Sequence, residues 1–322
     1  MQIISISDNL IHEAEMALLP SGCSFDEERR DYIRAEESLD LLAVPGSGKT
    51  TALQAKLYCM AKQKPLCKGA GILVLSHTNA AVDEIKNRLQ KIVPSLFEYP
   101  NAVCTVQEFV DRFLAIPFYE NAYHNNISYI DEDRYIYDVE RYLSANCYDT
   151  VLAYARKAFK QKYITSRFCE NDGGIVISNS VIYKEFSFLK TPSTWKGKEE
   201  ENINAVKKDI SKMKTSFMKN GILCFDDCYF LANRYISTMP AIINILRKRF
   251  PFVFVDEFQD LQQHQIDLID RVFDNPQVHL ERIGDPNQSI YSYSKQAGTC
   301  LWNPRNVKTI NKWDTCKLPC LI

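Results

Sequence analysis

The chain has 322 residues, of which 46% are hydrophobic and 25% charged, a composition typical of globular proteins that excludes fibrous and low-complexity classes. Its 39 Lys and Arg against 40 Asp and Glu leave a net charge of −1, so overall charge does not indicate nucleic-acid binding, although a local basic groove is compatible with it. No apolar run is long enough to span a bilayer, and the N-terminus lacks a secretory signal. We therefore expect a cytoplasmic protein of about two domains with reduced cysteines.

The first part of the chain alternates predicted helices with short apolar strands. Residues 1–20 and 27–36 have helical spacing, and the first strand runs directly into a glycine-rich turn that opens another helix. Such alternation is typical of a parallel sheet with helices packed on it. The predicted strands are Leu39–Val44, Gly71–Ser76 and Val103–Val106, and a helix is expected over Ala80–Val93.

A change of composition at about residue 116 marks the start of a predicted insertion. Residues 116–220 are rich in Tyr, Lys and Asn and show few strand signals, so we expect a mostly helical inserted subdomain. Within it, the stretch from Tyr154 to Tyr163 interleaves basic and aromatic residues. This pattern fits a helix that lines a nucleic-acid path, and it fits equally well a solvated helix with an aromatic core face.

Strand signals return after the insertion. Apolar runs at Phe252–Val255 and Val278–Ile283 predict two strands, with helices over Phe230–Phe250 and Gln262–Phe273. The expected fold class is therefore α/β, a parallel sheet flanked by helices. The expected organisation is a first part of this domain over 1–115, the helical insertion over 116–220, a second part over 221–300 and a tail over 301–322.

The sequence AVPGSGKT, from Ala43 to Thr50, fits the phosphate-loop pattern, with Ala43 in the first glycine position. The two glycines allow backbone N–H groups to face phosphates at a helix N-terminus. Lys49 would supply charge to the β- and γ-phosphates, and the Thr50 hydroxyl would bind Mg²⁺. A chance glycine-rich turn is the alternative, but the flanking strand and helix favour the phosphate loop. The predicted nucleotide-binding residues here are Pro45, Gly46, Ser47, Gly48, Lys49, Thr50 and Thr51.

Two later strands also end in polar residues. The run FVFVDEFQD places Asp256 and Glu257 directly after a buried strand, and parallel strands carry their carboxyl ends to the ligand. Asp256 is suited to the Mg²⁺ shell, and Glu257 to orienting and deprotonating an attacking water. An acidic helix start is the alternative for this pair. After the next strand, Gln288 is placed to contact a γ-phosphate.

Six motifs occur in order: AVPGSGKT, VLSHTNAAVDEI, TVQEF, FDD, FVDEFQD and GDPNQSIYSY. This set, over about residues 20–300, resembles the UvrD/Rep-like family of superfamily-one DNA helicases. The resemblance implies a RecA-like ATPase core that uses ATP and Mg²⁺ and translocates 3′ to 5′ on single-stranded DNA. It also implies that Lys49, Glu257 and Gln288 are catalytic and that Thr50 and Asp256 bind the metal.

The resemblance further implies a set of DNA-contacting residues. Thr78 and Asn79 match a Thr-Asn pair that touches the DNA backbone, and two tyrosines match aromatics on which bases stack. A helix cap is the alternative for Thr78 and Asn79, and a place in the core is the alternative for the tyrosines. The predicted DNA-contacting residues are His77, Thr78, Asn79, Thr105, Tyr291 and Tyr293.

The sequence departs from the family pattern at several positions, and again after the last motif. Arg29 stands where the family has a Gln that reads adenine, which leaves adenine selectivity open. Ser294 stands where the family has an Arg. After Gly298 the family's Tyr-Arg motif and second RecA-like domain do not follow, so we expect a truncated chain that lacks the arginine fingers of that domain.

Three functions are compatible with these observations. The first is an ATP-dependent DNA helicase or translocase, represented by its ATP-binding half. The second is a module that binds ATP and single-stranded DNA without unwinding by itself, and that a second chain completes. The third is another phosphate-loop class, a nucleotide kinase or GTPase. The sequence disfavours the third because the DEFQD run, Asp256 to Asp260, is atypical of kinases.

Overall fold

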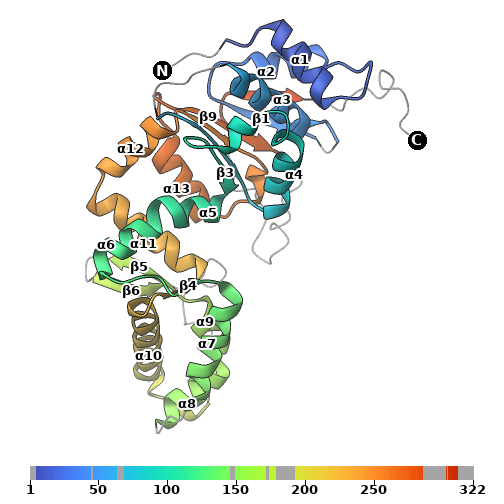
Figure 1. The fold of residues 1–322 in the computed structure, drawn as a ribbon. Helices are drawn as coiled ribbons and strands as arrows, with labels where there is room; N and C mark the ends of the chain where they lie inside the picture. Colours follow the sequence, from blue (N-terminus) through green and yellow to red (C-terminus); the bar gives the residue numbers. More distant parts are fainter. Residues whose placement is uncertain are drawn as a thin grey trace. The chain divides into compact units, whose positions relative to one another are not determined.

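The computed structural model describes residues 5–44, 46–63, 69–145, 149–171, 174–178, 193–285, 302 and 304–310. The chain divides into two compact units (Figure 1). Unit 1 comprises Met1–Phe109 and Met239–Ile322, and unit 2 comprises Val110–Thr238.

Unit 1 is built on a six-stranded sheet whose paired strands are all parallel, in the order β10-β1-β9-β8-β2-β3. The predicted α/β fold class is thus confirmed, and each strand expected from the sequence is present within one or two residues. The strands are β1 (Leu39–Ala43), β2 (Ile72–Ser76), β3 (Ala102–Thr105), β8 (Phe252–Val255), β9 (His279–Gly284) and β10 (Val307–Ile310).

Strand β10 was not expected from the sequence. It pairs with β1 from Val307 opposite Asp40 to Ile310 opposite Ala43, so the sheet takes an edge strand from the segment assigned to a tail. Asp40 secures this edge, because its carboxylate accepts hydrogen bonds from the Trp302 indole (3.2 Å) and the Arg305 backbone (2.5 Å). These contacts join residues more than 250 positions apart, which local patterns do not reveal.

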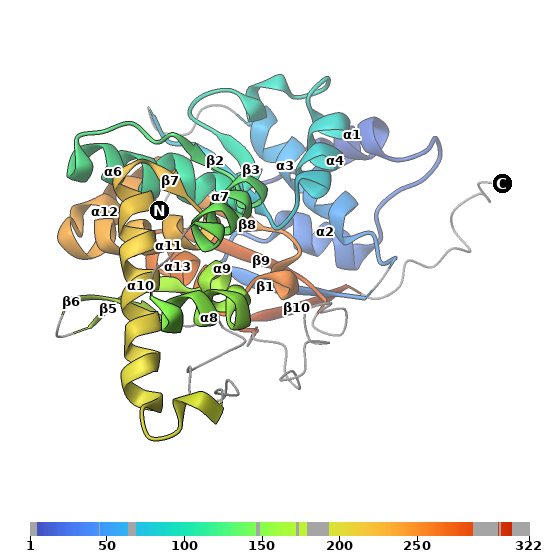
Figure 2. The ribbon, with the colours of Figure 1, turned by 90° about the horizontal axis from the view of Figure 1, so that it is seen from below.

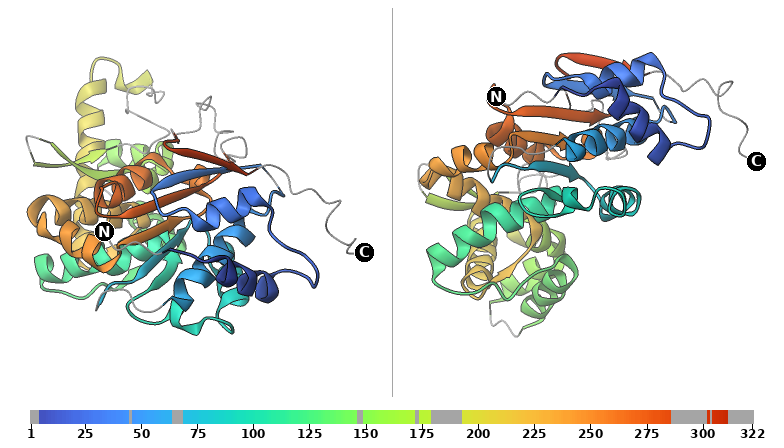
Figure 3. Two further views of the ribbon diagram at one scale, coloured as in Figure 1. Left: turned by 90° about the horizontal axis from the view of Figure 1, so that it is seen from above. Right: turned by 45° about the horizontal axis from the view of Figure 1, so that its top comes forward.

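Helices cover both faces of the sheet in unit 1 (Figures 1 and 3). The predicted helix over 230–250 is wrong as a single element, because the chain breaks near Pro240, which lacks a backbone N–H. The break separates α11 (Phe225–Thr238) of unit 2 from α12 of unit 1. The helices of unit 1 are α1 (Asp8–Leu18), α2 (Glu27–Arg34), α3 (Lys49–Lys62), α4 (Asn79–Leu89), α5 (Val106–Val110, ending at the first residue of unit 2), α12 (Ala241–Arg249) and α13 (Gln263–Phe273).

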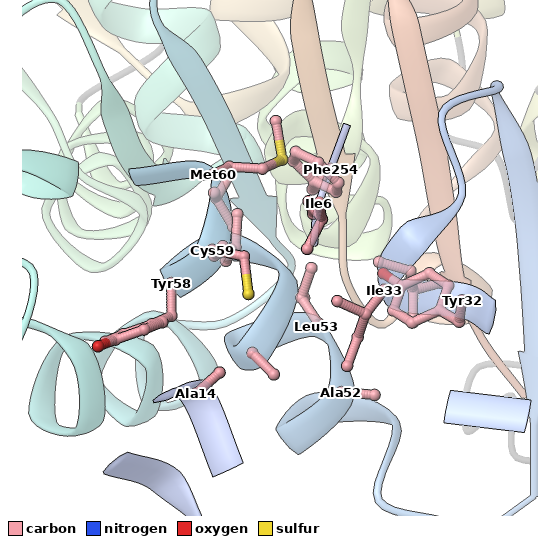
Figure 4. Packing of buried hydrophobic residues seen from close by; sticks show 14 of the residues in the cluster. Ile6, Ala14, Tyr32, Ile33, Ala52, Leu53, Tyr58, Cys59, Met60 and Phe254 are labelled. Carbon is pink, nitrogen blue, oxygen red and sulfur yellow. The ribbon is translucent and has the colours of Figure 1, made fainter. Parts of the chain in front are cut away.

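Helix α3 lies at the centre of a hydrophobic core of unit 1 (Figure 4). Leu53 and Leu57 are fully buried, among side chains from α1, α2 and the alternate strand positions that face this side of the sheet. Lys56, a buried residue of α3, also holds the helix in place. Its ammonium donates to the Ala35 carbonyl (2.8 Å) and to Glu281 on β9 (2.5 Å). The N-terminus of α3, which carries the phosphate-loop lysine, is therefore held on a rigid element.

Unit 2 is mostly helical and has its own core. Figure 2 shows its long helix α10 (Glu199–Lys219) beside α8 (Thr150–Ala158). A π-helix over Asp111–Ala115 and two small sheets complete it; the antiparallel pair β5–β6 was not expected from the sequence. Its other elements are α6 (Ile116–Tyr123), β4 (Tyr129–Ile130), α7 (Glu132–Ser144), α9 (Lys160–Thr165), β5 (Arg167–Asn171), β6 (Gly174–Ser178) and β7 (Ile222–Leu223).

The basic and aromatic stretch from Tyr154 to Tyr163 mainly faces this core. Arg156 is buried and donates from Nε and Nη2 to the Asp209 carboxylate at 3.0 and 3.1 Å, and the Tyr163 hydroxyl donates to the same group. Phe159 is also buried. Of the two interpretations that the sequence left open, the structure supports the helix with an aromatic core face.

Candidate nucleotide-binding and DNA-contacting site

The predicted site residues converge on the carboxyl edge of the six-stranded sheet. Leu42 on β1 lies opposite Gly284 on β9, and Val255 on β8 lies opposite both Leu75 on β2 and Arg282 on β9. The segments that leave these strands therefore start side by side, although they are far apart in the sequence. Open parallel sheets bind their ligands at this edge.

The phosphate loop joins β1 to α3 at this edge. Gly46 and Gly48 have φ angles of 72° and 75°, a left-handed conformation that glycine adopts without steric cost. Gly48 is the N-cap of α3, so Lys49, Thr50 and Thr51 fall in the first turn of the helix. Left-handed glycines directly before a helix N-terminus are the arrangement that lets backbone N–H groups face a phosphate.

Arg29, on α2, is hydrogen-bonded to the backbone of the phosphate loop. Its fully buried guanidinium donates from Nε to the Ser47 carbonyl at 3.1 Å and from Nη2 to the same oxygen, and it pairs with Asp26. The residue at the family's adenine-reading position is therefore bound to the loop backbone. Sequence reasoning missed this contact, which joins residues 18 positions apart. The Ser47 hydroxyl is buried and has no hydrogen-bond partner within the described part of the chain.

Lys49 and Glu257 meet across the site. The Lys49 ammonium lies 2.8 Å from Glu257 Oε2, and both side chains are partly exposed. Glu257 has a φ of 53°, unusual for a residue other than glycine, at the point where the chain turns from β8 into a short 3-10 helix over Phe258–Asp260. The lysine predicted to bind phosphate and the predicted general base are thus in direct contact.

Asp256 lies beneath this pair with only 2% of its surface exposed. Its Oδ1 accepts the backbone N–H of Glu257 at 3.0 Å. Burial, reinforced by the neighbouring charge of Glu257, raises the pKa of Asp256 to about 7. A carboxylate desolvated to this degree fits a site for a divalent cation, whose charge would reverse the shift. The residues present therefore fit a magnesium–nucleotide complex held by Thr50, Asp256 and the loop.

The described residues that the sequence predicts to contact DNA lie at the ends of β2 and β3, where Ser76 is opposite Thr105. Thr78 is exposed and caps α4 by accepting the Ala81 N–H at 3.3 Å. Asn79 is exposed and His77 half-buried. Thr105 is mostly buried, and its hydroxyl accepts the Glu108 N–H at 3.1 Å. The side chains of both threonines therefore cap the N-terminus of the helix that follows.

Four predicted site residues lie outside the described residues: Pro45, Gln288, Tyr291 and Tyr293. The roles assigned to them from the sequence stay predictions. A different residue emerges in the same region, because Gln259 contacts Glu257 although the sequence assigned it no role.

Fold and site together define a phosphate-loop protein of RecA-like α/β class. Residues 26–300 match a protein-family model described as the UvrD/REP helicase N-terminal domain. The chain therefore belongs to the UvrD/Rep helicase family, as its ordered motifs predicted.

Individual relatives agree with this assignment. The chain is 26% identical over 280 residues to a probable DNA helicase II homolog of Mycoplasma capricolum subsp. capricolum, covering 83% of this chain and 35% of that protein. It is 24% identical over 257 residues to the ATP-dependent DNA helicase PcrA of Bacillus subtilis, covering 79% and 31% of the two chains. The chain thus spans about a third of the length of these relatives. Among the described helices, none has the length and hydropathy needed to cross a membrane.

Proposed function

We propose that this chain binds ATP with Mg²⁺ and hydrolyses the ATP in response to single-stranded DNA, as the N-terminal ATPase part of a helicase or translocase that moves 3′ to 5′. The observation that carries the proposal is the meeting of Lys49, Asp256 and Glu257 beside the phosphate loop. Family membership supports the same assignment, since relatives such as PcrA are named ATP-dependent DNA helicases.

Each residue has a role in the proposed reaction. Loop N–H groups and Lys49 bind the β- and γ-phosphates, and Lys49 leaves its pairing with Glu257 to do so. Thr50 and Asp256 hold Mg²⁺, which neutralises phosphate charge when bound. Glu257, freed from the ammonium, orients the attacking water and accepts its proton. Gln288 contacts the γ-phosphate.

On the DNA side, we propose that Asn79 and the neighbouring His77 and Thr78 contact the strand's backbone, with Thr105 at the adjoining strand end. Tyr291 and Tyr293 stack on bases. The exposure of Thr78 and Asn79 at the edge of the sheet that carries the phosphate loop supports this arrangement.

A second candidate is a module that binds ATP and single-stranded DNA but unwinds only together with a further domain or a second chain. The matched family model describes an N-terminal domain, which favours this candidate. Strand-displacement assays on a duplex with a 3′ single-stranded tail separate the two functions.

Radiolabelled ATP hydrolysis, measured with and without oligo(dT), tests the proposal. Wild-type protein is expected to hydrolyse ATP faster with DNA, whereas Lys49→Ala loses binding and Glu257→Gln keeps binding but loses roughly 10²–10⁴-fold in rate. Hydrolysis that survives Glu257→Gln unchanged would refute the proposed role of that carboxylate.

A further inference from the structure

Gln259 occupies a buried position between the two acidic strand ends, with 5% of its surface exposed. Its amide nitrogen donates to Glu257 Oε2 at 2.6 Å, and its amide oxygen accepts the backbone N–H of Asp285 at 3.1 Å. One side chain therefore connects the proposed general base to the end of β9, from which the chain continues toward Gln288.

The same carboxylate oxygen of Glu257 serves two donors. It accepts from Lys49 Nζ at 2.8 Å and from Gln259 Nε2 at 2.6 Å. When Lys49 turns to the phosphates of a nucleotide, Gln259 remains as a neutral donor that keeps the carboxylate oriented. A neutral amide is suited to this task because it does not cancel the charge that makes the carboxylate a base.

The surroundings of Gln259 are shaped to hold it. A Cβ built on Gly284 would lie 2.1 Å from Gln259 Oε1 and 3.1 Å from the Trp302 ring, so only glycine leaves room for the amide. Trp302 in turn packs on Phe258, with ring centroids 5.4 Å apart. The position of the amide is thus fixed by β9 and by the segment that leads to β10.

We infer that Gln259 is a positioning residue for ATP hydrolysis: its amide holds the Glu257 carboxylate in place once Lys49 has moved to the nucleotide, and it couples that carboxylate to the end of β9. This inference rests on the proposed function. It assigns Gln259 no contact with the nucleotide, so its loss is expected to lower kcat and to leave nucleotide affinity nearly unchanged.

Two substitutions test the inference on the full chain, with kcat, KM and the Kd of a fluorescent ATP analogue as readouts. Gln259→Met keeps the length but removes both hydrogen bonds, and Gln259→Glu keeps the acceptor but places a carboxylate against Glu257. Both are expected to lower kcat by roughly 10- to 100-fold with KM and Kd within about twofold of wild type. Gly284→Ala, which displaces the amide without removing it, is expected to act in the same direction.

Gln265→Met is the matched control. This glutamine is also largely buried, but its amide oxygen caps α13 by accepting the Gln262 N–H at 2.9 Å. It is expected to lower the melting temperature and to leave kcat unchanged.

The outcomes separate the inference from the function on which it rests. Wild-type kcat in folded Gln259→Met and Gln259→Glu, an increase in KM alone, or an equal kcat loss in Gln265→Met overturns the inference and leaves the proposed function standing. Absence of DNA-stimulated hydrolysis in the wild-type protein overturns both. If Gln259→Met does not fold, as judged by circular dichroism, the nearly isosteric Gln259→Glu and Gly284→Ala decide the question by the same criteria.

Discussion

At the scale of single residues, Asp256 shows how a binding site reduces stability. Its carboxyl is almost completely buried, and burial together with Glu257 raises its pKa to about 7. A group whose pKa is raised by folding contributes stability below its unfolded pKa, near 4, and loses that contribution as the pH rises to 7. Ionising this carboxyl in the folded protein is therefore unfavourable unless a cation binds.

Asp256→Asn is expected to remove this cost. In metal-free buffer the variant should gain stability relative to wild type as the pH rises from 5 to 8, by on the order of 1–3 kcal/mol, since each pKa unit is worth about 1.4 kcal/mol. Urea unfolding of both proteins at pH 5 and at pH 8 measures this difference in unfolding free energy. A stability difference that does not change with pH would contradict the assignment, and the same variant should lose Mg²⁺-dependent nucleotide binding.

Arg29 makes the second prediction at this scale. Arg29→Gln removes the two hydrogen bonds to the Ser47 carbonyl, so we expect a loss of about 1–3 kcal/mol in unfolding free energy and roughly 3- to 10-fold weaker Mg–ATP binding. Arg30→Gln, on the same helix and paired with Glu15 away from the loop, is the control. Isothermal titration should show its affinity close to that of wild type; equal losses in both variants would indicate a general effect of α2.

At the scale of elements, the N-terminus of α4 combines structural and proposed binding roles. Thr78 caps the helix, whereas Asn79 is exposed in its first turn. Thr78→Ala is therefore expected to cost about 1 kcal/mol of stability, so its effect on DNA binding is mixed with an effect on folding.

Asn79→Ala isolates the proposed DNA contact. We expect roughly 3- to 10-fold weaker binding of fluorescein-labelled oligo(dT), measured by anisotropy at fixed salt, with an unchanged melting temperature. Asn87→Ala, exposed near the other end of α4, should leave both quantities unchanged. If Asn79→Ala binds like wild type, the Thr-Asn pair has no part in DNA contact.

At the scale of the whole molecule, the two units have separate cores. Unit 2 is held internally by the buried Arg156–Asp209 pair, with bonds of 3.0 and 3.1 Å. Removing one partner of such a pair leaves a buried charge uncompensated, at a cost of about 3 kcal/mol or more.

Arg156→Met is therefore expected to weaken unit 2 without changing the nucleotide site. Hydrogen exchange should accelerate within residues 110–238, while the affinity for Mg–ATP stays within about twofold of wild type. Lys157→Met, an exposed neighbour on α8, serves as the control. Faster exchange throughout β1, β8 and β9 would show that the units unfold together.

The sequence by itself determined the fold class, five of the six strands of the main sheet and the family, because strand and helix periodicity and the spacing of loop motifs are local properties of the chain. Roles assigned to Gln288, Tyr291 and Tyr293 stay predictions. Only the tertiary structure decided that 307–310 complete the sheet, that Arg29 braces the phosphate loop and that Gln259 bridges Glu257 and Asp285. These features depend on polar groups that meet after the chain has folded, and the burial that makes such contacts necessary is a property of the packed molecule.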